Sequence, residues 1–320
     1  MKKILKVIAF GLILTACQED ESLIINREWT QISNWGQDSF ARCIAVNGST
    51  IFVGTDSEIY RSTNNGNTWK KLPPYTQTQH LNGLRSLHIK NSILYGGEPL
   101  DGFIKSIDNG NNWTRVPNSI QDNETVYSIA SNSNYVFIGT YGSGLFRSEN
   151  NGDSWINVFE TASIGEPIWN VAVDGDNVLI FIPKKGLYHS TDNGSSWTNI
   201  TGDINVEFGS GAIHIKGETI FFGTNKFYKS NDLGTTWQEI TTTENGIQAT
   251  ASVWSIITND NILYASTGAG VFYSTDEGQN WVSLPNKDNF FDQVFRLASN
   301  SNYIFGVDQY NVHRISKLNN

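Results

Sequence analysis

The sequence predicts an all-β protein, a single seven-bladed β-propeller with four-stranded blades. Three observations support this prediction: one octet recurs six times, apolar strands recur seven times at the same period, and a strand near the N-terminus supplies the piece that the last repeat lacks. A repeat of about 42 residues is typical of solenoids and propellers. The chain has 320 residues, which is long enough for one large all-β domain.

The recurring octet has the pattern S-x-[DN]-x-G-x-x-W. Successive copies begin 44, 42, 42, 40 and 44 residues apart, at Ser62, Ser106, Ser148, Ser190, Ser230 and Ser274. Several copies carry Asn-Gly at the tip, as in Asn65-Gly66 and Asn193-Gly194. Both residue types tolerate positive φ, so Asn-Gly between apolar stretches predicts a tight hairpin.

A second series of segments gives the number of blades. Apolar strands that end in small residues begin near Ile51, Ile93, Val136, Val178, Ile220, Ile262 and Ile304. The seventh repeat stops just after Arg314-Ile315-Ser316, before an outermost strand, whereas Trp29-Thr-Gln-Ile32 matches the segment Trp197-Thr-Asn-Ile200. We therefore expect the N-terminal strand to complete the seventh blade and close the ring, which pairs edges that an open array would expose.

The first residues have the features of a secretion signal. Three lysines precede the apolar run 7–14, which is too short to span a bilayer. The segment ends Leu14-Thr15-Ala16-Cys17, which resembles the bacterial lipobox, where cleavage precedes a cysteine that then carries lipid. We expect a lipoprotein signal peptide over 1–16, lipidation at Cys17, a polar tether over 17–26 and the propeller over 27–320. The alternative is an ordinary secretory signal with a chance cysteine.

The residues after Cys17 are acidic and polar, with the sequence Gln18-Glu19-Asp20-Glu21-Ser22. They resemble the stretch that exports lipoproteins to the cell surface in the Bacteroidetes group. The resemblance implies an outer-membrane lipoprotein, exposed on the cell surface and held to the membrane through its N-terminal lipid only. Acylation of Cys17 would leave Cys43 as the lone thiol, which we interpret as a small buried hydrophobic residue.

The octets resemble those of the Asp-box, or bacterial neuraminidase, repeat propellers, and the resemblance covers residues 27–320. Seven repeats of this size are most similar to the photosystem II stability and assembly factor type of propeller; sialidases and xyloglucanases carry the same octet. The resemblance implies that the octet is a structural hairpin between the third and fourth strands, on the side away from the binding face. The residues that it assigns to the scaffold are Asp108, Asp192, Asp232 and Asp276. Asn64 and Asn150 replace the aspartate in two copies, which turn capping tolerates and carboxylate catalysis would not.

The repeats also separate scaffold residues from candidate site residues, since a side chain that recurs at one repeat position supports the fold. His88 and His214 recur on the innermost strand, and Arg61, Arg147 and Arg314 recur on the third strand, so we assign both sets to the scaffold. The sequence has no His-Glu-x-x-His or Cys/His spacing, no phosphate loop and no nucleophile elbow. We therefore expect neither a metal nor a cofactor.

One position of the innermost strands carries a large side chain in six of the seven blades. In blade order it is occupied by Arg42, Arg85, Tyr127, Trp169, Gly211, Trp254 and Phe295. Aromatic rings stack on sugars or apolar side chains, and arginine binds carboxylates through two hydrogen bonds. We therefore predict that the six large residues form a ligand-binding ring at the channel mouth. The alternative is that they only fill the channel.

Long loops between the blades lie on the same face as this ring. They span residues 73–84, 117–125, 159–167, 241–251 and 285–293, and they carry Tyr75, Glu124, Glu166, Phe290 and Asp292. Loops held by a rigid scaffold often carry binding residues, so they are a second place for a site.

Charge and motif content narrow the function. The excess of 31 acidic over 22 basic residues gives a net charge of -9, which repels phosphate backbones, so we expect no nucleic-acid partner. A sialidase would need three convergent arginines, and nothing in the sequence shows that Arg42, Arg85 and Arg296 converge. We expect a monomeric, non-catalytic propeller that binds a glycan or a protein segment on its channel face. The alternatives are a sialidase-like glycoside hydrolase and a chaperone-like assembly factor for an envelope complex.

Overall fold

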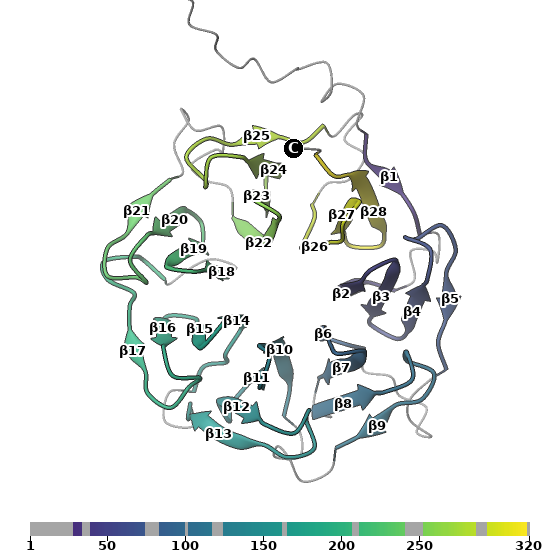
Figure 1. Cartoon of the computed structure of the whole chain (residues 1–320), viewed down its shortest axis with the longest axis horizontal. Helices are drawn as coiled ribbons and strands as arrows, with labels where there is room; N and C mark the ends of the chain where they lie inside the picture. The colour runs from purple at the N-terminus through teal and green to yellow at the C-terminus, as the bar shows by residue number, and fades with distance from the viewer. Residues whose placement is uncertain are drawn as a thin grey trace, which may run out of the picture.

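The strands of the chain form a ring of blades around a central opening (Figure 1). The structure is a computed structural model, which describes residues 28–33, 39–73, 83–99, 102–116, 124–161, 165–206, 211–240, 252–285 and 293–318. In these residues, 28 strands pair into seven antiparallel sheets of four strands each. The predicted seven-bladed propeller is therefore confirmed.

Each blade runs outward from the channel. The innermost strands are β2 (Ala41–Asn47), β6 (Ser86–Lys90), β10 (Val126–Ser131), β14 (Asn170–Asp174), β18 (Ala212–Lys216), β22 (Val253–Asn259) and β26 (Arg296–Ser299). The second strands are β3 (Thr50–Thr55), β7 (Ile93–Glu98), β11 (Val136–Thr140), β15 (Asn177–Ile182), β19 (Thr219–Gly223), β23 (Ile262–Thr267) and β27 (Tyr303–Val307). The third strands are β4 (Ile59–Ser62), β8 (Gly102–Ser106), β12 (Leu145–Ser148), β16 (Gly186–Ser190), β20 (Phe227–Ser230), β24 (Gly270–Ser274) and β28 (Val312–Ser316). The outermost strands are β1 (Thr30–Gln31), β5 (Lys70–Lys71), β9 (Thr114–Arg115), β13 (Ile156–Phe159), β17 (Thr198–Asn199), β21 (Gln238–Glu239) and β25 (Val282–Ser283).

The second strands form the core of the protein because each lies between two neighbouring blades. In β15, five consecutive residues are buried, so the strand is apolar on both faces. Phe181 of this strand packs 5.2 Å from Phe222 of the next blade, measured between ring centroids. The core is thus a chain of apolar contacts between blades that follows the ring.

The N-terminal strand closes this ring. In β1, Thr30 pairs with Arg314 and Gln31 with His313 of β28, the third strand of the last blade (Figure 1). Trp29 is 6% exposed and belongs to an apolar cluster that joins blades six and seven. The backbone oxygen of Ile32 accepts a hydrogen bond from Trp69 Nε1 of blade one at 2.5 Å. The expected closure by the N-terminal strand is confirmed.

The octets all form the same turn between the third and fourth strands. In blade four, Ser190 Oγ accepts a hydrogen bond from Gly194 N at 2.7 Å, and Asp192 Oδ1 accepts from Ser196 N at 2.8 Å. Asn193 and Gly194 have φ values of 57° and 88°, which a β-branched residue would rarely adopt. The hydrogen bonds that Asp192 accepts, first from the Ser190 hydroxyl, lower the pKa of its carboxyl to about 2.

Equivalent contacts recur in the other copies. A backbone N–H four residues along the chain donates to a carboxylate oxygen of Asp108, Asp232 and Asp276. Asn64 Oδ1 accepts the same hydrogen bond, from Thr68 N at 2.9 Å. An amide oxygen therefore caps this turn as a carboxylate does.

Arginines of the third strands join consecutive blades. Arg61 Nη1 donates to Asn109 O and Arg147 Nη1 donates to Asn193 O, both at 2.6 Å. In each case the acceptor is the first of the two residues with positive φ in the octet of the next blade. Arg314 Nη1 donates to Asn65 O at 2.5 Å, so the same contact joins the last blade to the first.

Candidate functional site

Three of the six predicted ring residues lie at irregular positions of the innermost strands. In blades one, three and six, the pairing register with the second strand skips one residue, which marks a β-bulge. The skipped residues are Arg42, Tyr127 and Trp254. A bulge redirects a side chain away from the regular alternation of the strand, so these three side chains leave the alternating pattern of their strands.

The other three ring residues directly precede the regular pairing of their blades. The backbone N–H of each donates to a carbonyl of the second strand, from Arg85 to Gly97 at 2.8 Å, from Trp169 to Phe181 at 3.1 Å and from Phe295 to Val307 at 2.8 Å. These bonds fix the backbone at the channel mouth. The side chains therefore project from rigid positions, although each residue directly precedes its strand.

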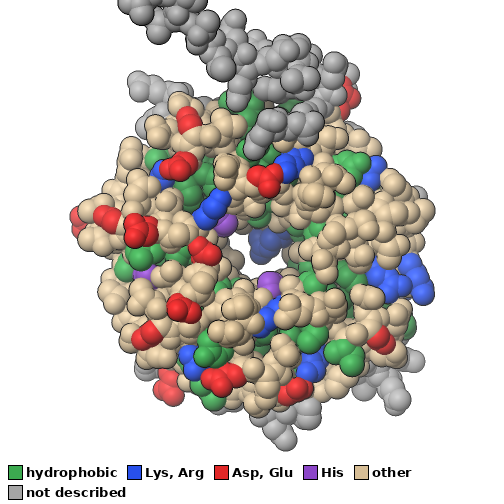
Figure 2. All heavy atoms as spheres, in the orientation of Figure 1, with side chains coloured by type: hydrophobic (Ala, Val, Ile, Leu, Met, Phe, Trp, Pro, Cys, Tyr) green, Lys and Arg blue, Asp and Glu red, His purple; other side chains and the backbone are tan. Residues whose placement is uncertain are grey.

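Five of the six residues line one cavity at the channel mouth, with a volume of about 370 Å³. Its lining consists of Arg42, Arg85, Tyr127, Trp169 and Phe295, together with Ala41, Asn170 and Arg296. Trp254 does not line the cavity, but its ring packs 5.2 Å from the ring of Phe295. The molecule is open at its centre, and Lys or Arg side chains lie within the opening (Figure 2).

Two arginines of this cavity have no carboxylate partner in the described part of the chain. Arg85 is exposed and makes no side-chain hydrogen bond or ion pair to another described residue. Arg296 Nη1 donates only to the backbone oxygen of Phe295 at 2.9 Å. The Arg296 side chain is exposed at the channel, but protein atoms surround it on the other sides. The resulting desolvation lowers the pKa of its guanidinium. An arginine nevertheless stays charged at neutral pH.

Arg42 differs because it is already paired. Its Nε and Nη2 atoms donate to the two carboxylate oxygens of Asp56 at 2.6 and 3.0 Å, and its guanidinium lies 5.1 Å from the centre of the Phe40 ring. A bidentate pair of this kind largely cancels the positive charge of Arg42. The free positive charge of the cavity therefore comes from Arg85 and Arg296.

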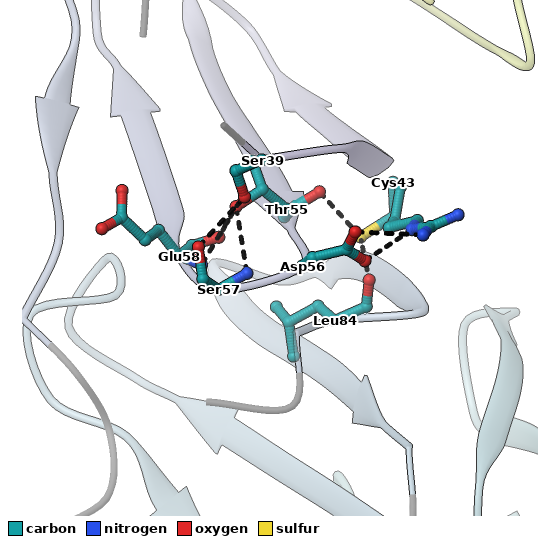
Figure 3. Close-up of polar contacts among 9 residues, drawn as sticks. Ser39, Cys43, Thr55, Asp56, Ser57, Glu58 and Leu84 are labelled. Atoms are coloured by element: carbon teal, nitrogen blue, oxygen red, sulfur yellow. Dashed lines mark hydrogen bonds and ion pairs between the residues drawn. The ribbon is translucent and has the colours of Figure 1, made fainter. Parts of the chain in front are cut away.

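A threonine places Asp56 beside this arginine. Thr55 ends β3, and its hydroxyl accepts hydrogen bonds from Glu58 N at 3.0 Å and from Ser39 Oγ at 2.8 Å. Figure 3 shows the Asp56 carboxylate on the side of this turn away from Ser57 and Glu58, and it accepts its hydrogen bonds from Arg42. The turn that Thr55 fixes therefore aims the Asp56 carboxylate at the channel side of the blade.

The channel wall is basic although the protein is acidic. Among the described residues of the innermost strands, the Lys and Arg residues are Arg42, Lys90, Lys216 and Arg296, against one acid, Asp174. The Asp174 carboxylate accepts a hydrogen bond from Gly217 N at 2.6 Å. The field in the channel therefore favours an anionic group, in contrast to the net charge of -9.

The two histidines of the innermost strands contact neighbouring blades. His88 Nε2 lies 2.7 Å from Ser131 Oγ, and His214 Nε2 lies 2.6 Å from Thr258 Oγ1. Burial lowers the pKa of each imidazole to about 4, so both are neutral at pH 7. They add no charge to the channel.

Three residues at the mouth were not identified from the sequence, namely Asp56, Tyr141 and Asn170, whereas Arg296 was considered there only as a member of a sialidase-like arginine trio. Tyr141 is 56% exposed, and its ring centre lies 6.3 Å from that of Tyr127, so it extends the aromatic surface outward. Asp56 and Tyr141 each follow a threonine that ends a second strand. The position directly after this threonine recurs among the blades, and it was the sequence signal that could have identified both residues.

The residues of the long loops between the blades, which form the second candidate site, differ in their contacts. Glu124 is buried and accepts hydrogen bonds from Gly142 N at 2.5 Å and Ser143 Oγ at 3.0 Å, so it caps a turn. Glu166 pairs with Lys184 at 3.0 Å. Tyr75, Phe290 and Asp292 lie outside the described residues, as do Cys17, the predicted signal peptide over 1–16 and the predicted tether over 17–26.

The described residues lack two features that would indicate a membrane span or a metal site. They contain no helix with the length and hydropathy needed to cross a membrane. They also contain no group of three or more His, Cys, Asp or Glu side chains able to hold a metal ion.

Comparison with solved structures identifies other propellers. A GH74 xyloglucanase from Xanthomonas campestris superposes with a TM-score of 0.68 at 15% identity, over 90% of this chain and 53% of that one. YCF48 bound to D1 peptide gives a TM-score of 0.70 at 12% identity, over 92% of this chain and 97% of that one. The extracellular domain of BT4673 from B. thetaiotaomicron, described as a one-component system, gives 0.73 at 12% identity, over 92% of this chain and 40% of that one.

At these identities the likeness shows the fold alone, and the chain spans only about half of the xyloglucanase. No protein-family model and no curated protein sequence matches the chain.

Proposed function

We propose that this protein is a non-catalytic binding propeller that holds a glycan or a protein segment at its channel mouth. The observation that carries the proposal is the cavity of about 370 Å³ lined by both cations and aromatic rings. Its volume lies in the range of small-molecule sites, and the guanidinium of Arg85 is free of described partners. We infer that the bound group carries a carboxylate or another anion beside a ring or apolar surface.

Two of the similar propellers support a ligand of this kind without identifying it. One is named as a xyloglucanase and another is bound to a peptide. The substrate and the peptide belong to those proteins, and at 12–15% identity the likeness shows only a shared fold. The choice between a glycan and a protein segment therefore needs a direct measurement.

The ligand class is tested with the lipid-free protein, residues 18–320, on a glycan array and in a pull-down from envelope extract. We expect saturable capture of one ligand class, with roughly tenfold weaker capture by Trp169→Ala because its ring is 37% exposed at the cavity. Capture that Trp169→Ala leaves unchanged would place the ligand elsewhere. A partner held stoichiometrically in pull-downs alone would favour the assembly-factor role.

A sialidase-like glycoside hydrolase is the second candidate, because Arg42, Arg85 and Arg296 converge on one cavity. Three arginines around a carboxylate would suit an acidic sugar. Against this role, none of the described lining residues is Asp or Glu, whereas glycoside hydrolysis ordinarily uses two carboxylates. Release of 4-methylumbelliferone from its sialoside by the wild type, and its loss in Arg85→Gln, would favour this candidate over simple binding.

We further propose that the propeller is a lipoprotein of the outer membrane, exposed on the cell surface and anchored through Cys17. The support is the basic, apolar and small-residue order of 1–17. Mass spectrometry of the native protein is expected to give an acylated N-terminal Cys17, and Cys17→Ser should move the protein out of the membrane fraction. An unmodified N-terminus beyond residue 17 would contradict the proposal.

A further inference from the structure

A second cavity lies between blades five and six, on the face of the ring opposite the channel mouth. Its volume is about 710 Å³, and its lining includes Thr219, Phe221, Thr258, Leu263 and Glu277. Lys216 at the end of β18 also lines it, whereas Ala212 at the start of that strand adjoins the mouth. At about 3.3 Å per residue, the strand separates the two cavities by roughly 13 Å.

In two other blades a tyrosine ring occupies the place that corresponds to this cavity. In blade three, Tyr135 stands two residues before Phe137, whose register partner on the third strand is Arg147. The guanidinium of Arg147 lies 4.7 Å from the centre of the Tyr135 ring. Blade seven repeats this arrangement, with Arg314 4.8 Å from the ring of Tyr303. In both blades a phenol ring lies beside a cation between consecutive blades.

Blade five keeps the cation but lacks the ring. Phe221 pairs with Lys229 in the same register, and the residue two before Phe221 is Thr219, which has no ring. Thr219 and Phe221 both line the cavity, so the space corresponds to the position of the tyrosine in blades three and seven.

Lys229 at this position makes a long ion pair but donates no hydrogen bond to a described residue. Its side chain is 6% exposed, and its ammonium lies 5.7 Å from the centre of the Phe221 ring. The nearest carboxylate oxygen, of Glu277, is 3.7 Å away, which is too long for a hydrogen bond. Arg147 and Arg314, in contrast, each donate to a backbone oxygen of the next octet. No described residue accepts a hydrogen bond from Lys229.

We propose that this cavity is a binding site for a phenol-type ring, carried by a small molecule or by a tyrosine side chain. The ring takes the place that Tyr135 and Tyr303 take in their blades and lies beside the Lys229 ammonium as a cation–π partner. Thr219 and Thr275 hold hydroxyls at the rim without partners among the described residues, and they can bond the phenol oxygen. The site is separate from the channel mouth and does not depend on the function proposed for it.

The test is ligand-observed NMR of the lipid-free protein with p-cresol, the side-chain analogue of tyrosine. We expect saturable binding of p-cresol to the wild type. Thr219→Tyr should lower the affinity roughly tenfold or more, because the new ring fills the cavity. Lys229→Met should lower the affinity by a smaller factor. Ile107→Ala, a change at a 78% exposed side chain in another octet, serves as the control and should bind as the wild type does. Thr219→Tyr should also raise the melting temperature.

N-acetyl-tyrosinamide distinguishes the two sources of the ring. Tighter binding than p-cresol favours a tyrosine of a protein partner, and exclusion of the larger probe favours a small phenol. Absence of saturable p-cresol binding to the wild type would overturn the proposal. Binding that both Thr219→Tyr and Lys229→Met leave intact would overturn it equally, since p-cresol would then occupy another place.

Discussion

A variant that begins at Gln37 is expected to melt roughly 10 °C or more below the full-length protein and to aggregate. The deletion removes β1 and the 6% exposed Trp29, and loss of a buried tryptophan of this kind costs about 3–5 kcal/mol. It also leaves β28 as an exposed edge. In addition, it removes the backbone oxygen of Ile32, which accepts a hydrogen bond from Trp69 Nε1. Differential scanning calorimetry and light scattering measure both effects.

The matched control for this deletion begins at Asn26. It lacks the predicted signal and nearly all of the tether but keeps Trp29 and β1, so it should melt as the lipid-free protein does. Equal melting temperatures for the two variants would mean that β1 contributes nothing to ring closure.

Replacing Trp281 by Ala is expected to lower the free energy of unfolding by about 3–5 kcal/mol. This octet tryptophan is 4% exposed, packs with its ring centre 5.2 Å from that of Phe227, and donates from Nε1 to Gly278 O at 3.1 Å. Urea denaturation followed by circular dichroism measures the loss. Binding per folded molecule should not change, because Trp281 lies in the octet turn rather than at the mouth.

The neighbouring residue provides the control. Val282 is 46% exposed on the outermost strand, so Val282→Ala should change the free energy of unfolding by no more than about 0.5 kcal/mol. If the two substitutions had equal effects, the octet tryptophan would not be part of the core.

The fold was predictable from the sequence because each blade repeats the same local chemistry. The Ser-x-Asp-x-Gly turn specifies one hairpin through its own hydrogen bonds, and the match of Trp29-Thr-Gln-Ile32 to the fourth strands identified ring closure. These signals are local and repeated six or seven times. They therefore predict the architecture without knowledge of any contact between blades.

The candidate site was predictable only in part. Aligning the innermost strands placed Arg42 and Arg85 at the same level, and both line the cavity. The pairing of Arg42 with Asp56 was not predictable, because it depends on a turn 14 residues away whose direction is set by Thr55. The convergence of Arg296 with Arg42 and Arg85 was not predictable either, because Arg296 follows the aligned position by one residue and only the closure of the ring brings it to the mouth.

Gly211 shows a further limit of the repeat alignment. The glycine suggests a gap in the ring of side chains, but a Cβ at this position would lie 2.0 Å from the Phe181 ring, and its φ is 63°. A side chain there would therefore strain the backbone and clash with the core. The glycine is required by packing, which a list of aligned residues does not reveal.

The central claim is that the channel mouth is the binding site, and calorimetric titration of the captured ligand tests it most directly. We expect Arg85→Gln to lower the affinity roughly tenfold and to reduce its dependence on salt, with no change in melting temperature, because Arg85 is exposed and has no described partner. Lys70→Gln removes the same charge from the outermost strand of blade one and should leave the affinity unchanged. Unchanged affinity in Arg85→Gln, or a lowered melting temperature with full affinity per folded molecule, would show instead that the mouth residues only fill the channel.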